Sequence, residues 1–275
     1  MIIKKIYMKF IHYMYPVFWY FQFIRLKIMN KKEKLTPINS SGKTLILVPH
    51  ADDELIGCYK FIKTFKNNCI LCFFSYTGYD KSIKNKIIRE NEFVKFCDFM
   101  NVNYRILKEN NIKSELEMLI DIEQPENIML PSIFDWHWEH RKINEILFKT
   151  KINNLNIIWY QITIPIPQEI ATSYLELTKE ELKEKYRVFS CIYKSQYDMP
   201  IKRLQYSERI EGEKVEKYAV EKYAYMPLKK WKSLVLLTNY NQLDIYIKYI
   251  NNIVKIRKEI NNWFYNISRC LNEKN

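Results

Sequence analysis

Short β-type runs alternate with helical patterns from residue 43 to residue 162, and this alternation constrains the fold more than any other feature. Strands are expected at 43–48, 69–76, 104–107, 127–130 and 155–162, with helices at 55–67, 83–100, 112–122 and 139–150. Strands joined by helices of this length form right-handed βαβ units. We therefore expect an α/β fold: a Rossmann-like, mostly parallel sheet with helices on both faces. No Gly-x-Gly-x-x-Gly follows the first strand, so nothing supports a dinucleotide site.

A polar cluster follows the first predicted strand. The apolar run 44–48 ends at Pro49, and His50, Asp52 and Asp53 come next, at the end of a strand where open α/β sheets bind ligands. His50 and Asp53, three residues apart on a turn, can bind a divalent metal ion. Asp52 would then point elsewhere and could act as a general base. Alternatively, the acidic residues only favour the helix dipole and His50 is a turn residue, and this motif alone does not decide.

A second cluster follows the predicted strand 127–130 and another proline. It contains Asp135, His137, Glu139 and His140. In a parallel sheet the two clusters can meet at one edge, where His140 would complete a set of two histidines and one carboxylate, leaving His137 as an acid or a transition-state contact. The alternative is a polar loop whose Trp136 and Trp138 fill a groove. Because three of only four histidines follow strand–proline junctions, we favour a metal site.

These clusters resemble the LmbE-like (PIG-L) family of zinc-dependent N-deacetylases of amino sugars. The motifs that carry the resemblance are His50-Ala51-Asp52-Asp53-Glu54, Thr77-Gly78, Arg89-x-x-Glu92, Asp135-x-His137-x-x-His140, Lys194-Ser195-Gln196 and Glu208-Arg209-Ile210-Glu211-Gly212. They cover residues 43 to 225. Two positions depart from the family pattern: Ala51 replaces the usual proline, and Glu139 stands where the family usually has Asp.

The resemblance implies a role for each matching residue. Zinc would be held by His50, Asp53 and His140, with Asp52 as the general base and His137 as the acid or electrostatic partner. Arg89 matches the family arginine that contacts the substrate sugar. From the residues alone, Arg89 could equally pair with Glu92 on the helix surface. A site with two histidines and one carboxylate also accepts iron(II), cobalt or nickel.

The activity implied by the resemblance is hydrolytic removal of the N-acetyl group from an N-acetylated amino sugar. The substrate would resemble N-acetylglucosamine, linked to a lipid or nucleotide during glycan biosynthesis. Two alternatives stay open: a metal-dependent amidase acting on a non-sugar acyl amide, and a basic membrane-associated binding protein with a vestigial metal site.

The net charge is +13, from 44 basic and 31 acidic residues. Such a surface attracts phosphates in nucleic acid, in anionic lipid or in a nucleotide- or pyrophosphate-linked sugar. No nucleic-acid-binding motif accompanies the charge, so we expect no nucleic-acid partner. The sequence does not indicate an oligomeric state.

The two ends of the chain are expected to form helices outside a deacetylase-like domain at 43–240. Residues 1–28 hold an aromatic apolar run, 10–24, between basic flanks; it is short for a membrane span and lacks a signal-peptide cleavage site. We favour a peripheral helix on an anionic leaflet, and the alternative is a helix packed on the domain. Residues 29–42 are interpreted as a linker and 241–275 as an amphipathic helix that packs on the core or on a partner subunit.

Between these ends, 178–195 is expected to be a helix and Lys202 to Arg209 an added strand. The six cysteines are interpreted as reduced thiols of a cytoplasmic protein, which we expect to lie at the inner face of the membrane if residues 1–28 bind it. Cys69 and Cys72 lie in one strand and would point to opposite faces, which argues against a shared metal or redox role.

Overall fold

A computed structural model of the protein describes residues 2–29, 32–40, 42–107, 111–238, 249 and 251–272, with side chains from residue 14 to residue 269. An eight-stranded sheet runs through it in the order β1-β7-β8-β6-β5-β2-β3-β4. Its strands are β1 (Thr36–Pro37), β2 (Thr44–Val48), β3 (Cys69–Phe73), β4 (Asn103–Ile106), β5 (Asn127–Pro131), β6 (Asn156–Tyr160), β7 (Ser173–Leu177) and β8 (Ala219–Pro227).

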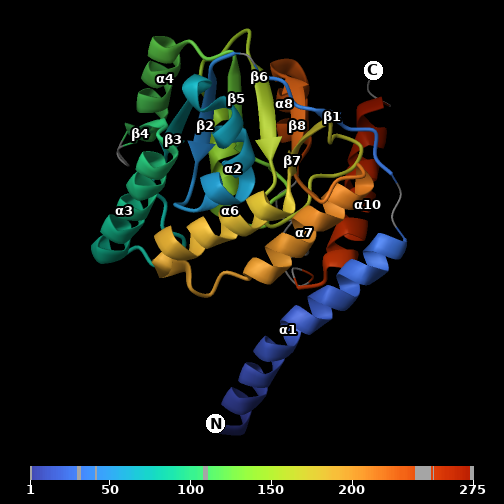
Figure 1. The fold of residues 1–275 in the computed structure, drawn as a ribbon. Helices are drawn as coiled ribbons and strands as arrows, with labels where there is room; N and C mark the ends of the chain where they lie inside the picture. Colours follow the sequence, from blue (N-terminus) through green and yellow to red (C-terminus); the bar gives the residue numbers. More distant parts are fainter. Residues whose placement is uncertain are drawn as a thin grey trace.

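The sheet is mostly parallel, as the alternating pattern predicts. β4, β3, β2, β5 and β6 are joined by parallel ladders, and only β8 is antiparallel to its neighbours β6 and β7. In Figure 1 the strands stand side by side, with helices in front of and behind them. β7 and β8 come after the alternating part of the sequence, and the sequence analysis did not predict either strand.

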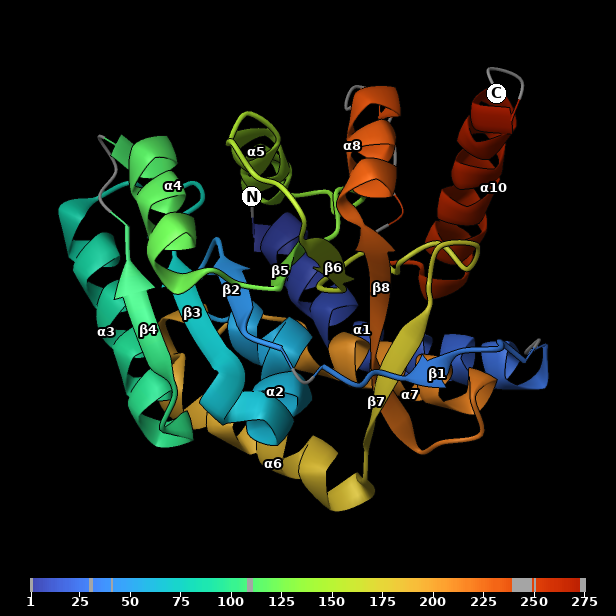
Figure 2. The same cartoon turned by 90° about the horizontal axis from the view of Figure 1, so that it is seen from above.

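Helices cover both faces of the sheet, which confirms the predicted fold class. One hydrophobic core lies between the sheet and α4 (Ile112–Glu123), α5 (Trp138–Phe148), α8 (Leu228–Leu237) and α10 (Ile253–Asn272). The other lies under α2 (Asp53–Phe65), α3 (Ile83–Met100), α6 (Lys179–Ile192) and α7 (Ile201–Lys214). Figure 2 shows the sheet between these two sets of helices.

The side chains of one strand alternate between the two cores. Leu45 and Leu47 of β2 belong to the first core, while Ile46 and Val48 belong to the second. Period-two alternation gives this division, and both faces are apolar because both are covered. Cys69 and Cys72 are likewise divided between the two cores, as the sequence predicts.

Gly57 allows α2 to lie close to β6. A Cβ atom at this position would lie 2.3 Å from Cδ2 of Tyr160, closer than atoms can approach. Tyr160 cannot easily move away, because it is fully buried and its hydroxyl donates a hydrogen bond to the carbonyl oxygen of Leu47 at 2.8 Å. The absence of a side chain at Gly57 therefore fixes the depth at which the first turns of α2 pack, and with it the position of the polar cluster that precedes them.

The prediction of a strand at Lys202–Arg209 is wrong, because this segment lies in α7. Leu204, Glu208 and Glu211 are buried at spacings of three and four residues, which is helical periodicity. Polar residues at two of these inward positions hid the helical pattern from a reading based on apolar residues.

The terminal segments differ in part from the expectation. Within the expected linker 29–42, Thr36–Pro37 forms β1 and pairs with β7. α1 (Ile2–Ile28) packs against α7 and α10 through Trp19 and Phe23. Of the helix expected at 241–275, α10 covers 253–272, whereas 239–248 and 250 lie outside the described residues.

Candidate active site

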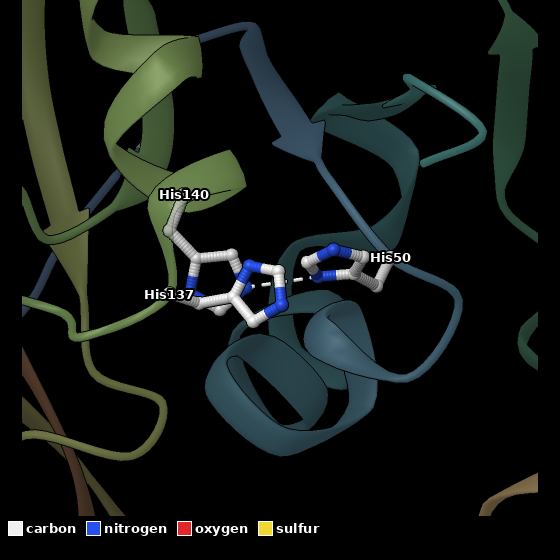
Figure 3. A group of neighbouring side chains, drawn as sticks. All are labelled: His50, His137 and His140. Carbon is white, nitrogen blue, oxygen red and sulfur yellow. Dashed lines mark hydrogen bonds between the residues drawn. The ribbon is translucent and has the colours of Figure 1, made fainter. Parts of the chain in front are cut away.

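The two polar clusters meet at one edge of the sheet. β2 and β5 are neighbours in a parallel ladder, with Thr44 opposite Asn127, so the segments after their carboxyl ends lie together. His50 follows β2, whereas His137 and His140 come from the start of α5, and in Figure 3 their three imidazoles converge. One ring nitrogen of each histidine lies within 4.8 Å of the others.

Three atoms from these clusters form a compact triangle. Nδ1 of His50 lies 3.0 Å from Nε2 of His140, the contact drawn as a dashed line in Figure 3. Oδ2 of Asp53 lies 3.2 Å from each of these nitrogens. The backbone N–H of His50 also donates to this oxygen at 2.9 Å, which fixes the carboxylate in the turn. The structure thus brings together the three residues predicted to hold a metal ion.

The outer nitrogens of the two histidines face carboxylates. Nε2 of His50 lies 2.6 Å from Oε2 of Glu139, and Nδ1 of His140 lies 3.1 Å from Oδ1 of Asp135. Glu139 also accepts the backbone N–H of Gly78 at 3.1 Å. An imidazole that donates outward to a carboxylate keeps its inner nitrogen as a lone pair, as in carboxylate–histidine–metal arrangements.

The triangle fits a divalent cation. If each ring carries its only proton on the outer nitrogen, the lone pairs of His50 and His140 and the carboxylate of Asp53 face one another without a proton between them. Three such acceptors repel unless a cation lies at their centre. Tetrahedral ligands about 2.0–2.2 Å from zinc are about 3.3–3.6 Å apart, close to the observed edges of 3.0–3.2 Å. Two nitrogens and one oxygen also suit zinc chemically, with a further position open.

The charges of the surrounding groups also favour a cation at the centre of the triangle. Burial by itself would lower the pKa of His140, but Asp53 and Asp135 outweigh it and raise that pKa to about 10. Burial would likewise raise the pKa values of both carboxyl groups, but His140 and further hydrogen bonds hold them below their usual range. Two buried carboxylates therefore stay ionised here and attract positive charge, which either a second proton on His140 or a bound metal ion can supply.

The carboxylate of Asp52 is not part of the triangle, and its Oδ2 atom lies 4.0 Å from Nη1 of Arg89. Its backbone has φ 131°, in a region where only glycine is free of strain, so the turn holds the residue in an unusual conformation. Its side chain is buried, and burial, followed by the charge of Asp53, raises its pKa to about 7. A carboxylate with a pKa near neutrality can accept and return a proton at physiological pH.

His137 lies beside the triangle as a neutral imidazole. Burial and the neighbouring His50 and His140 lower its pKa to about 4. Its Nδ1 atom accepts the backbone N–H of Glu139 at 3.3 Å, so the ring proton resides on Nε2. His137 therefore offers a neutral N–H donor, and of its two predicted roles the geometry favours the electrostatic one over that of an acid.

Comparison with solved structures identifies the fold. No protein-family model and no curated protein matches the sequence. The N,N'-diacetylchitobiose deacetylase from Pyrococcus horikoshii matches the structure with a TM-score of 0.54 and 15% identity, over 68% of this chain and 85% of that chain. The zinc-inhibited form of teicoplanin deacetylase matches with a TM-score of 0.52 and 12% identity, over 67% and 98%. The chain has the LmbE-like fold.

The LmbE-like fold does not by itself decide the reaction. The 4-carboxy-2-hydroxymuconate hydratase GalB from Pseudomonas putida also matches, with a TM-score of 0.51 and 11% identity, over 68% of this chain and 96% of that chain. The fold therefore carries hydratase as well as deacetylase chemistry, and function has to be argued from the site.

The two departures from the LmbE-like motif keep the site intact. Ala51 is buried, and its carbonyl oxygen accepts a hydrogen bond from Nη1 of Arg89 at 3.1 Å. The longer side chain of Glu139 reaches both His50 and the backbone of Gly78 with a single carboxylate oxygen. Gly78 has φ 67°, which suits glycine.

Arg89 lies at the site and does not pair with Glu92. Its Nη1 atom lies 4.0 Å from Oδ2 of Asp52, and its buried Nε has no hydrogen-bond partner among the described residues. Glu92 instead accepts two hydrogen bonds from Ser195, from the backbone N–H at 2.8 Å and from Oγ at 2.6 Å. The helix-surface alternative is therefore wrong, and the guanidinium group of Arg89 lies near Asp52.

Several supporting residues were not indicated by the sequence. Thr163 donates to Oδ2 of Asp135 from its backbone N–H at 3.0 Å and from its hydroxyl at 2.8 Å. Tyr193 donates to Glu54, while the backbone N–H of Asp52 donates to the other oxygen of Glu54 at 3.0 Å. These contacts join residues far apart in the chain, and no local pattern marks them. Of the motifs matched in the sequence, Lys194-Ser195-Gln196 lies directly after one of these residues, Tyr193.

Proposed function

We propose that the protein is a metal-dependent hydrolase that removes the acetyl group from an N-acetylated amino sugar. The observation that carries the proposal is the triangle of His50, Asp53 and His140 with Asp52 beside it. The LmbE-like fold, shared with deacetylases, supports the same reaction class.

His50, Asp53 and His140 would hold the ion, which we propose to be zinc. When bound, it would supply a Lewis acid for the amide carbonyl and lower the pKa of a nearby water molecule. The two outer carboxylates, Glu139 and Asp135, keep the imidazole rings oriented for this role.

The protein's own groups would then move the proton and stabilise charge. Asp52 accepts the proton of the attacking water and returns it to the departing amine. Nε2–H of His137 donates a hydrogen bond to the carbonyl oxygen as negative charge develops there. Arg89, whose Nη1 atom lies 4.0 Å from Oδ2 of Asp52, binds a hydroxyl group of the sugar.

We further propose that the enzyme contacts an anionic membrane surface. Met14, Val17, Phe18 and Phe21 form one exposed stripe on α1, while Trp19 on another side of the helix is buried against the domain. Figure 1 shows the amino-terminal half of α1 projecting from the molecule.

Basic groups lie next to this apolar stripe. Phe18 borders a groove with Arg25, Lys255 and Lys258, whose side chains are exposed. An apolar stripe beside cations suits anionic lipids, as on the cytoplasmic leaflet. No helix among the described residues is long and apolar enough to cross a membrane. We propose peripheral contact there, with a role in glycan assembly.

The test of the function is acetate release by purified protein whose metal content is known. N-Acetylglucosamine and its phosphorylated, nucleotide-linked and lipid-linked derivatives serve as substrates. Release that stops after chelation and returns with zinc supports the proposal. Bound metal without acetate release from any of these sugars would contradict it, and a parallel assay with non-sugar acyl amides and an unsaturated acid would then separate amidase from hydratase chemistry.

A further inference from the structure

A cleft of about 600 Å³ opens beside the candidate active site. Its lining includes Tyr76, Thr77, Lys81, Lys86, Trp138 and Lys142, and we call it the lysine cleft. Glu139 also borders it, and the carboxylate of Glu139 lies 2.6 Å from Nε2 of His50. The lysine cleft is therefore directly next to the triangle, and a ligand extending from the triangle would enter it.

Positive charge dominates the lysine cleft. Three of its lining residues are lysines, and its carboxylate, Glu139, already accepts hydrogen bonds within the site from His50 and Gly78. Lys81 and Lys142 are exposed, so the cleft presents ammonium groups to solvent beside the triangle. Such a lining concentrates anions at the mouth of the site.

Aromatic rings hold two of these ammonium groups in place. Nζ of Lys142 lies 5.1 Å from the ring centroid of Tyr76 and 5.7 Å from that of Trp138. Nζ of Lys81 lies 5.8 Å from the same Trp138 ring. Cation–π contacts orient both lysines without neutralising them. Both positive charges contact the same indole, and an anion bound near them would reduce their mutual repulsion.

The lysine cleft is also within one sugar unit of the groups proposed to act on the amide. The rings of Trp138 and His137 are nearly parallel, with centroids 6.4 Å apart. Trp138 is 40% exposed, so part of its side chain faces the outside. His137 therefore marks the acetamido end of a bound substrate, and Lys81 and Lys142 mark the position of a group beyond it.

We propose that the lysine cleft binds a phosphoryl group attached to the amino sugar, so that the substrate is a phosphate- or diphosphate-linked N-acetylated amino sugar. This inference rests on the proposed function. Lysine ammonium groups bind phosphate as point charges, and the aromatic contacts preset their positions. The phosphoryl group would come from a nucleotide or from a lipid carrier, and both present the same chemistry to the cleft.

The kinetic test compares neutral and phosphorylated substrates. Wild type is assayed for acetate release with N-acetylglucosamine, N-acetylglucosamine 1-phosphate, its uridine diphosphate derivative and a polyprenyl diphosphate derivative in detergent. We expect at least a tenfold higher kcat/KM for phosphorylated sugars, through KM. The double variant Lys81→Gln/Lys142→Gln should lose this advantage, while the control Lys179→Gln/Lys183→Gln, on exposed positions of α6, should keep it. The better of the two diphosphate substrates identifies the carrier.

A binding measurement separates failure of this inference from failure of the proposed function. Calorimetry with N-acetylglucosamine 1-phosphate uses Asp52→Asn protein with and without the Lys81→Gln/Lys142→Gln changes. If binding depends on the lysines but wild type releases acetate from no substrate, phosphate binding by the lysine cleft is retained and the deacetylase function is overturned. If neutral and phosphorylated sugars release acetate equally and the lysine changes have no effect, phosphate binding by the lysine cleft is overturned and the deacetylase function is retained.

Discussion

At the scale of single residues, the roles proposed for Asp52 and Asp53 depend on one turn. The carboxylate of Asp53 contacts His50 and His140, whereas that of Asp52, whose backbone has φ 131°, lies 4.0 Å from Nη1 of Arg89. Two adjacent aspartates thereby acquire opposite electrostatic environments. The pKa of Asp53 is held low by His140 against the effect of burial, and burial raises that of Asp52 to about 7. One suits a metal ligand and the other a base.

Replacing Asp52 should separate metal binding from catalysis. We expect Asp52→Asn to lower kcat for acetate release by about 10²–10⁴-fold, because the amide cannot accept the proton of water. Metal content, measured by elemental analysis, should stay near that of wild type, since Asp52 is not part of the triangle. The matched variant Asp53→Asn should lose both metal and activity. An Asp52→Asn protein with normal turnover would refute its assignment as the base.

At the scale of secondary-structure elements, a buried ion cluster joins α2, α6, α7 and β8. Lys185 of α6 is fully buried, and its ammonium group donates to Glu208 of α7, to Glu221 of β8 at 2.7 Å and to the carbonyl oxygen of Ile56 in α2 at 2.7 Å. Tyr186 donates to the second oxygen of Glu208 at 2.7 Å. The cluster thus connects α2, which carries Asp53, to the later part of the chain.

Removing the central cation should destabilise the fold strongly. Lys185→Met leaves Glu208 and Glu221 as buried carboxylates without a counter-ion, which we expect to cost about 3–5 kcal/mol of unfolding free energy in denaturant titrations. Adding Glu208→Gln should recover part of this loss, because one uncompensated charge disappears. Lys183→Met, at an exposed position of the same helix, should change stability by less than about 0.5 kcal/mol. A loss below about 1 kcal/mol for Lys185→Met would show that the cluster contributes little.

At the scale of the whole molecule, α1 packs on the domain along one side, while its contact with a membrane stays a proposal. Trp19 and Phe23 pack on the domain, where the ring of Phe23 lies 5.4 Å from that of Tyr206. Phe21 is 65% exposed and Phe18 44%, on a side of the helix that the described residues leave uncovered. A helix attached by one side and apolar on another can link the domain to a second apolar phase.

Vesicle co-sedimentation tests this role of α1. We expect the full chain to bind phosphatidylglycerol vesicles more tightly than phosphatidylcholine vesicles and to lose affinity as salt rises. Phe18→Glu/Phe21→Glu should reduce binding at least tenfold, whereas Phe99→Glu, at a residue of α3 that is 52% exposed, should not. If vesicles do not bind and a concentration-dependent dimer is lost in the double variant, the stripe contacts a second copy instead.

The sequence by itself determined the parallel half of the sheet and the place of the site. Periodicity is a local property, and apolar strands separated by helices can form few arrangements other than right-handed βαβ units. Because β2 and β5 run in the same direction, the polar residues after Pro49 and Pro131 had to come to the same edge. The prediction that His50, Asp53 and His140 lie together followed from this, while their roles stay proposals.

Only the tertiary structure decided which groups support the site and how the later part of the chain completes the sheet. β8 enters antiparallel between β6 and β7, and the partners of Asp135 and Glu92 are Thr163 and Ser195. Burial of polar side chains in pairs such as Lys185 with Glu208 gives no apolar periodicity, so α7 resembled a strand in the sequence. Such contacts depend on residues that are distant along the chain, and local patterns carry no record of them.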